Sequence, residues 1–361
     1  MIFPEKEAFM SDKIIKQIFL IGFFIFFISG ISIAAETKNQ SSFFNSSLHY
    51  TTRGMAYWYD KENGGLETHT GLPYLSGKLD CVNCHIGSCD VCHKTIDGNK
   101  AVYTVKAARN QDVCLNCHKR ERTIMKIDSD NKQQDVHFSK GMQCMDCHTA
   151  RDVHGDGKEY NSMKQTGAID AKCENCHQVI TETTAHKIHN GRLDCNACHV
   201  RHVVSCSNCH FETLVNDKKR VDMKLSGWTF LINYNGQVTA GTMQTYVLKD
   251  NKTFLMFAPQ NSHSIMKEGR KCADCHGSDN AKKAQSGSFI LTWLENGELK
   301  QSKGVIPVAE GVQYNFVPFN YINGKWEPFE KISNTGLHYA GYGSPLTKEQ
   351  LRKLSTSMGK E

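Results

Sequence analysis

The run Cys81-Val82-Asn83-Cys84-His85 is the first copy of a pattern in which two cysteines, separated by two residues, are followed at once by a histidine. Eight copies occur in the 361 residues. The others occupy residues 89–93, 114–118, 144–148, 173–177, 195–199, 206–210 and 272–276. Together they use 2 × 8 = 16 cysteines, which is the whole cysteine content. No cysteine is therefore left for a disulfide or a separate thiol site.

C-x-x-C-H is the attachment signature of c-type haem, in which two thiols bond to the haem and the histidine ligates its iron. A zinc ribbon explains the cysteine pairs but not the histidine after each pair, and a disulfide framework does not explain the fixed gap. We therefore expect eight covalently attached haem c groups. Their thiols are Cys81, Cys84, Cys89, Cys92, Cys114, Cys117, Cys144, Cys147, Cys173, Cys176, Cys195, Cys198, Cys206, Cys209, Cys272 and Cys275. Their proximal iron ligands are His85, His93, His118, His148, His177, His199, His210 and His276.

The histidine count indicates the second iron ligand. Removing the eight motif histidines from 17 leaves nine for eight irons. This near-match predicts ligation by two histidines at each iron, with one histidine to spare. Methionine, present 12 times, is the competing ligand and would raise a haem's potential. The candidate distal ligands are His49, His69, His137, His154, His186, His189, His202, His263 and His338.

Individual positions add expectations about pairing. His137, His189 and His263 each shortly precede a motif, where a histidine ligates that haem or a stacked neighbour. His202 lies between two motifs and is expected to reach a third haem. His49 and the far downstream His338 are the least certain candidates. The pairing of each histidine with its iron is left open.

The chain divides unevenly into four parts. Residues 1–35 form a signal peptide or N-terminal anchor, and residues 36–80 a segment that supplies distal histidines. Residues 81–215 are expected to form a seven-haem domain of loops and short α-helices dominated by haem. Residues 216–361 are expected to form a β-rich module with the eighth haem and a short C-terminal helix that has Pro345 at its first position. Asn-Gly pairs at 235–236, 296–297 and 323–324 lie between aromatic, β-branched runs, which predicts hairpin turns.

The N-terminus indicates export. Lys13 and Lys16 precede an apolar run over residues 18–33, and Ile33-Ala34-Ala35 offers a small-residue cleavage site. The alternative is an uncleaved anchor, through which alone the protein would contact a membrane. A periplasmic, extracellular or cell-surface location is expected. The formal charge of +6 says little about partners, because haem propionates would offset it, and nucleic-acid binding has no support.

At the level of its motifs, residues 81–276 resemble the multihaem c-type cytochrome superfamily. That resemblance implies one of two branches. The electron conduits use haems with two histidine ligands throughout. The octahaem and pentahaem reductases of nitrite, hydroxylamine or tetrathionate keep one haem open or ligate it with lysine. All eight motifs here end in histidine and no C-x-x-C-K variant occurs, which favours the conduit.

The two branches imply different partners. A conduit exchanges electrons with redox proteins or an extracellular acceptor, and self-assembly into a haem chain or filament is a further possibility. In the reductase alternative, the spare histidine would serve a substrate pocket. His154, in a Gly-rich loop, is the first residue to test for that role, although a distal ligand is the expected one. For the conduit no catalytic residue is expected.

Overall fold

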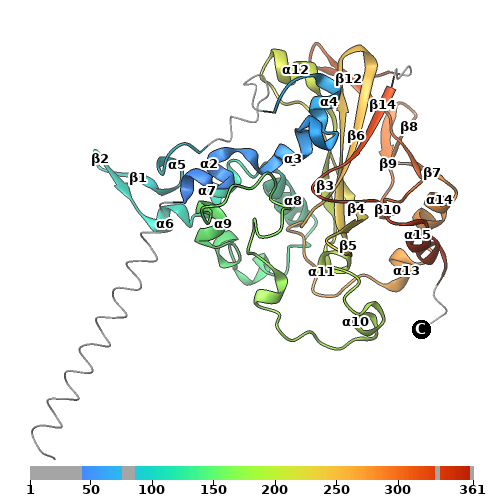
Figure 1. The fold of residues 1–361 in the computed structure, drawn as a ribbon, viewed down its shortest axis with the longest axis horizontal. Coiled ribbons are helices and arrows are strands. Elements are labelled where there is room, and N and C mark those ends of the chain that lie inside the picture. The colour runs from blue at the N-terminus through green and yellow to red at the C-terminus, as the bar shows by residue number, and fades with distance from the viewer. Residues whose placement is uncertain (1–42, 75–85, 330–333, 358–361) are drawn as a thin grey trace, which may run out of the picture.

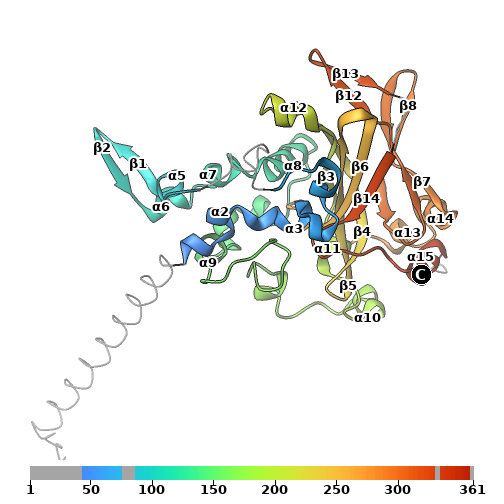
Figure 2. The ribbon, with the colours of Figure 1, turned by 45° about the horizontal axis from the view of Figure 1, so that its top comes forward.

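The computed structural model describes residues 43–74, 86–329 and 334–357. The predicted signal segment and the first motif, Cys81 to His85, lie outside these residues. Figures 1 and 2 show two parts side by side: a region of short helices and loops, and a β-sheet built mainly from the later half of the chain. In the described part of the chain, no helix is long and apolar enough to cross a membrane.

The helical region is built from single turns and very short helices. The α-helices are α2 (Leu48–Thr51), α3 (Ala56–Tyr59), α4 (Leu66–Thr70), α5 (Asp90–His93), α6 (Val105–Ala108), α7 (Gln111–Leu115), α8 (Lys119–Asp130), α9 (Ala150–His154), α10 (Thr184–His189) and α11 (Cys195–His199). The 3-10 turns are η1 (Phe44–Ser46), η2 (Arg53–Met55), η3 (Lys61–Asn63), η5 (Phe138–Lys140), η6 (Cys144–Asp146) and η7 (Cys173–Asn175). The side chains of Thr104, Asn110, Thr149 and Thr183 cap the helices that follow them, so polar residues stop and restart the chain at short intervals.

A six-stranded sheet with the order β10-β4-β3-β5-β6-β14 forms the second part. Its strands are β3 (Val203–His210), β4 (Met223–Tyr234), β5 (Gln237–Val247), β6 (Lys252–Pro259), β10 (Gly304–Pro307) and β14 (Asn334–Tyr339). β4 and β5 pair beside the Asn235-Gly236 turn and then separate, and β3 fills the space between them. β3 is therefore a central strand of the sheet.

Four two-stranded sheets complete the strands: β1 (Lys94–Asp97) with β2 (Lys100–Tyr103), β7 (Ser288–Ile290) with β11 (Gln313–Asn315), β8 (Thr292–Glu295) with β9 (Glu298–Gln301), and β12 (Phe319–Ile322) with β13 (Lys325–Pro328). Asn235-Gly236, Asn296-Gly297 and Asn323-Gly324 join antiparallel strands with positive φ at both residues. The three predicted hairpin turns are confirmed.

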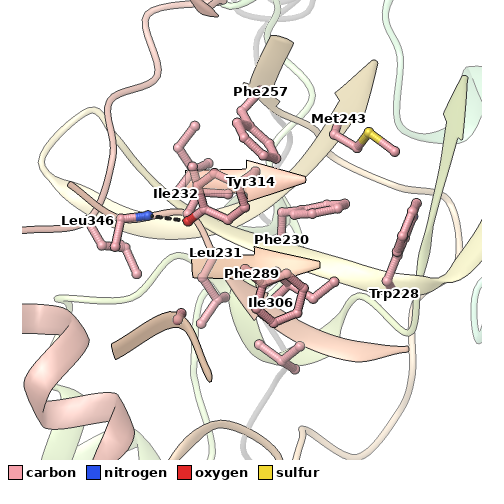
Figure 3. Packing of buried hydrophobic residues seen from close by; sticks show 14 of the residues in the cluster. Trp228, Phe230, Leu231, Ile232, Met243, Phe257, Phe289, Ile306, Tyr314 and Leu346 are labelled. Carbon is pink, nitrogen blue, oxygen red and sulfur yellow. Dashed lines mark hydrogen bonds between the residues drawn. The ribbon is translucent and has the colours of Figure 1, made fainter. Parts of the chain in front are cut away.

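The sheet is covered on both faces. Leu255 and Phe257 of β6 point into a cluster with Trp228, Phe230 and others, shown in Figure 3. Phe254, Met256 and Ala258, which alternate with them, point into a second cluster. Since neighbouring residues of a strand face opposite sides, the two clusters lie on opposite faces of the sheet. Trp58 of α3 and Leu66 of α4 belong to the second cluster and so join the N-terminal segment to the sheet.

Two sequence-based boundaries differ from the structure. The seventh motif was expected in the helical region ending at residue 215, but it forms part of β3, inside the sheet. The C-terminal helix was expected to have Pro345 at its first position. It is α15 (Lys348–Ser355), which begins three residues later because Thr347 and Gln350 form its capping box. The remaining helices are α12 (Phe211–Asn216), α13 (Cys272–Cys275) and α14 (Asp279–Gln285), with the turn η8 (Lys249–Asn251).

Candidate functional site

Six motif histidines each face one of the other histidines across a narrow range of distances. The ring centroids lie 6.0 to 6.4 Å apart. The pairs are His93 with His154, His118 with His49, His148 with His263, His177 with His137, His199 with His186, and His276 with His189. Six of the nine candidate distal ligands therefore meet a motif histidine.

The spacing can be compared with the geometry of two imidazoles on one metal ion. A metal–nitrogen bond is about 2.0 Å long and a ring nitrogen lies about 1.2 Å from its ring centroid, so two rings on opposite sides of an ion have centroids about 6.4 Å apart. The observed distances of 6.0 to 6.4 Å are within a few tenths of this value. Each pair thus fits one iron between its rings.

Hydrogen bonds fix which nitrogen of these rings faces the partner. Nδ1 donates to a backbone carbonyl oxygen in six of the paired histidines, which leaves Nε2 for a metal ion. The bonds run from His49 to Val153, His93 to Thr104, His186 to Thr181, His189 to Ala185, His199 to Met266 and His276 to Lys353, at 2.8 to 3.2 Å.

Two paired histidines have a buried carboxylate in place of a carbonyl. Nδ1 of His148 lies 3.2 Å from an oxygen of Asp152, and Nδ1 of His137 lies 3.4 Å from an oxygen of Asp135. Both aspartates are at most 6% exposed. Neither was predicted as a site residue. The available signal was the capping-box pattern of Thr149 and Asp152, which places the carboxylate one turn after His148.

The candidate distal histidines that shortly precede a motif do not face that motif. None of His137, His189 and His263 faces the motif that follows it in the sequence; each faces the histidine of a different motif. His49, one of the least certain candidates, faces His118. His154, considered for a substrate pocket, faces His93.

The motifs follow one another in space in their sequence order. The Cys114 and Cys144 thiols are hydrogen-bonded, which lowers the pKa of Cys114 and raises that of Cys144, and Cys173 and Cys195 form a second such pair. Burial and a nearby thiol of another motif raise the pKa of three further cysteines: Cys114 lies near Cys92, Cys176 near Cys147, and Cys198 near Cys275. Six motifs, all those described except the seventh, therefore form a continuous series.

A large cavity adjoins this series. Its volume is about 1280 Å³, and Met125, Asp135, Phe138, Met142 and His263 are among its lining residues. Pockets for drug-sized ligands commonly have volumes of about 300–1,000 Å³. The space beside the His148–His263 pair is thus large enough for a porphyrin-sized group.

Three candidate distal histidines face no motif histidine within the described ranges. His202 is buried, and its Nε2 lies 2.9 Å from an oxygen of Asp128. That it reaches a third haem stays a prediction. His69 and His338 are close to each other beside Phe254. Burial lowers the pKa of both, that of His338 to about 4. His85 lies outside the described residues.

The seventh motif differs from the others. Cys206 and Cys209 are buried in β3, each 3% exposed. Sγ of Cys206 lies 3.4 Å from Nζ of Lys224 and 3.7 Å from a guanidinium nitrogen of Arg120. His210 faces Asn320 rather than a histidine, with Nε2 3.2 Å from the amide oxygen. The short helical turn that carries each of the other six described motifs is absent here.

Comparison with known proteins adds one similarity. No protein-family model matches the chain, and no solved structure does. The dissimilatory sulfite reductase MccA of Wolinella succinogenes is 22% identical over 231 residues. The match covers 50% of this chain and 31% of that protein, so it spans about a third of the relative's length. Together with the repeated motif, this weak similarity suggests a multihaem cytochrome-like protein.

Proposed function

We propose that this protein is an exported multihaem c-type cytochrome that passes electrons along a series of closely spaced haems. The observation that carries the proposal is the set of six histidine pairs, each 6.0 to 6.4 Å between centroids, arranged along the chain of neighbouring motifs. A purely structural role for twelve histidines would not require this constant spacing.

The residues present fit the group that the motifs imply. In each of the six, two thiols precede a histidine whose ring faces a second ring at the distance for one iron. Nδ1 hydrogen bonds to carbonyl oxygens leave Nε2 directed at the partner ring. When bound, a c-type haem supplies a one-electron couple whose potential depends on its axial ligands. Two histidines favour a lower potential than histidine with methionine.

The protein's own fold holds the imidazole rings of each pair in position. Pairs drawn from distant parts of the sequence, such as His148 with His263, fix the order of the motifs in space. The pairs at the two ends of the series are carried by α5, which holds His93, and by α13, whose motif ends in His276. α5 and α13 lie at opposite sides of the molecule in Figure 1, which suits entry of electrons at one end and exit at the other.

The proposal is tested by electron paramagnetic resonance of the purified, fully oxidised protein. The expected spectrum is dominated by low-spin ferric haem, because the six pairs supply two nitrogen ligands to each iron. A strong high-spin signal that survives in the presence of all paired histidines contradicts it. Periplasmic and cell-surface fractions should contain the protein, and electron microscopy of the latter separates a shuttle from a filament.

A multihaem reductase is the second candidate. The observation that favours it is the similarity to the sulfite reductase of Wolinella succinogenes, over half of this chain. A reductase would oxidise a reduced viologen dye only in the presence of its substrate. Sulfite, nitrite, hydroxylamine and tetrathionate are the substrates to compare, and turnover with any one of them at a rate above that of free haem would favour the reductase.

A further inference from the structure

We propose that Cys206 and Cys209 carry no haem and instead form a pair of free, buried thiols, with Cys206 held between the cationic side chains of Arg120 and Lys224. The inference rests on the proposed function only in assuming that the other motifs carry haem. It reduces the number of attached groups from the eight that the motif count implies to seven.

Cys209 and His210 point to opposite faces of the sheet. Cys209 pairs with Tyr246 of β5, and His210 pairs with Val247. Cys209 and Tyr246 both belong to the second hydrophobic cluster. Since neighbouring residues of a strand point to opposite faces, His210 points away from that cluster. One haem cannot be bonded to thiols on one face and ligated by a histidine on the other.

The ring of His210 already has a hydrogen-bond partner at each nitrogen. Nδ1 lies 2.6 Å from the hydroxyl oxygen of Thr213, and Nε2 lies 3.2 Å from the amide oxygen of Asn320. In the six paired motifs, the ring of the motif histidine faces a second imidazole. His210 is 8% exposed, so its ring is buried as well as hydrogen-bonded at both nitrogens.

The space around the two thiols is filled by other side chains. Cys209 packs with Trp58, Tyr246 and Phe254. Burial raises its pKa to about 12, which is the environment of an inert structural thiol. Within the described residues, the side chains that contact Sγ of Cys206 are Arg120 and Lys224 rather than a thiol of another motif.

Specific hydrogen bonds hold the motif in its strand. The hydroxyl groups of Ser205 and Thr242 lie 3.2 Å apart, and those of Ser207 and Thr245 lie 3.1 Å apart, so β3 is tied to β5 on either side of Cys206. Asn208 has a φ of 55°, which marks the irregularity between the two cysteines. Its amide oxygen accepts from the backbone N–H of Phe319 at 3.1 Å. A helical turn at this motif would break all three interactions.

The arrangement gives the thiols a different role. Arg120 lies at the start of α8, two residues after His118, and its guanidinium also lies 3.3 Å from the side-chain oxygen of Gln260. Cys206 thus helps to attach α8, and with it the His118–His49 pair, to the sheet. Arg220 is also close to both thiols. A thiol sulfur accepts hydrogen bonds from such cationic groups only weakly, but these contacts need no porphyrin.

The test is to count haems and free thiols in the holoprotein. Intact-mass spectrometry should show seven attached haems. Alkylation after denaturation should label two thiols, and peptide mapping should place both at Cys206 and Cys209. Eight haems, or a haem on the peptide containing these residues, overturns the inference. No attached haem at all would instead be the failure of the proposed function.

Paired variants provide the second readout. Replacing both thiols of the seventh motif by serine (Cys206→Ser with Cys209→Ser) should leave the haem count per folded protein unchanged. The matched control, Cys173→Ser with Cys176→Ser, should lose one haem. Arg120→Gln should weaken attachment of α8 without changing the haem count. If the first double variant loses a haem as the control does, the inference is wrong, whatever its effect on yield.

Discussion

The rings of His189 and His276 face each other with centroids 6.3 Å apart and planes inclined by 23°. The two residues come from different parts of the chain: His189 ends α10 in the helical region, and His276 follows α13, which lies between β6 and β7. Both Nδ1 atoms donate to carbonyl oxygens, at 2.8 and 3.0 Å. This ring contact therefore links the helical region to the C-terminal half.

Replacing His189 by methionine should change one haem and leave the others as they are. Methionine with histidine gives a haem a higher potential than two histidines do. We expect one component of a potentiometric titration to move upward, while the haem count stays constant. His202→Gln is the control, because His202 faces no motif histidine among the described residues, and it should leave the titration unchanged. An unchanged titration in the His189 variant would remove this residue from the ligand set.

Asp152→Asn should raise the potential of the haem at the His148–His263 pair. The Asp152 carboxylate accepts the hydrogen bond from Nδ1 of His148 at 3.2 Å, which makes the imidazole a stronger donor to ferric iron. An amide cannot supply the negative charge. For a one-electron couple about 59 mV corresponds to a tenfold change in relative affinity, so a shift on that order or smaller is expected.

Asp156→Asn is the matched control for this variant. Asp156 bonds to Arg151 at 2.7 Å and to the hydroxyl group of Tyr160 at 3.0 Å, and not to a paired histidine. Redox titration of both variants distinguishes an effect of Asp152 on the haem potential from an effect on the local fold. Equal titration curves for the two would show that Asp152 only supports the local fold.

Lys164 should make stability rise with pH in the alkaline range. Burial lowers its pKa from 10.5 to about 8, while Nζ bonds to Asn261 at 2.8 Å. Between these pH values the unfolded chain binds more protons than the folded chain, so stability increases from about pH 8 to about pH 10.5. The gain is about 1–3 kcal/mol. Lys164→Met should abolish this part of the slope, measured by chemical denaturation at several pH values. An identical slope in both proteins would contradict it.

The large cluster of the sheet should dominate the stability of the C-terminal half. Phe257 is fully buried against Phe230 and Tyr314, and Phe257→Ala should cost about 3–5 kcal/mol. Ile290, which is 55% exposed, is the control, and its replacement by alanine should change stability by less than about 0.5 kcal/mol. Denaturation followed by tryptophan fluorescence measures both values. Similar losses in the two variants would show that this cluster is not the main stabilising element.

The sequence predicted those parts of the structure that depend on local chemistry. The Asn-Gly turns require positive φ at neighbouring residues, and all three join strands as expected. Six of the nine histidines outside the motifs face motif histidines. The near-match between nine such histidines and eight motifs already suggested this pairing. Which histidine meets which could not be predicted, because the contact between His148 and His263 depends on how distant segments pack.

The seventh motif shows that the C-x-x-C-H pattern alone does not predict the local backbone structure. Residues 206–210 match the same pattern as the others, yet the flanking Ser205 and Ser207 pair with threonines of β5 and hold the segment extended. The partners of these serines lie more than 30 positions away. Asp152 was missed for a related reason: its role is visible only once His148 and the helix after it are placed together.

The most direct test of the central claim is the position of the irons in a crystal of the holoprotein, located by anomalous scattering at the iron edge. The account predicts one iron midway between the two rings of each of the six pairs, within bonding distance of both Nε2 atoms. Irons bound to the motif histidines alone, with the partner histidines turned away, would contradict it.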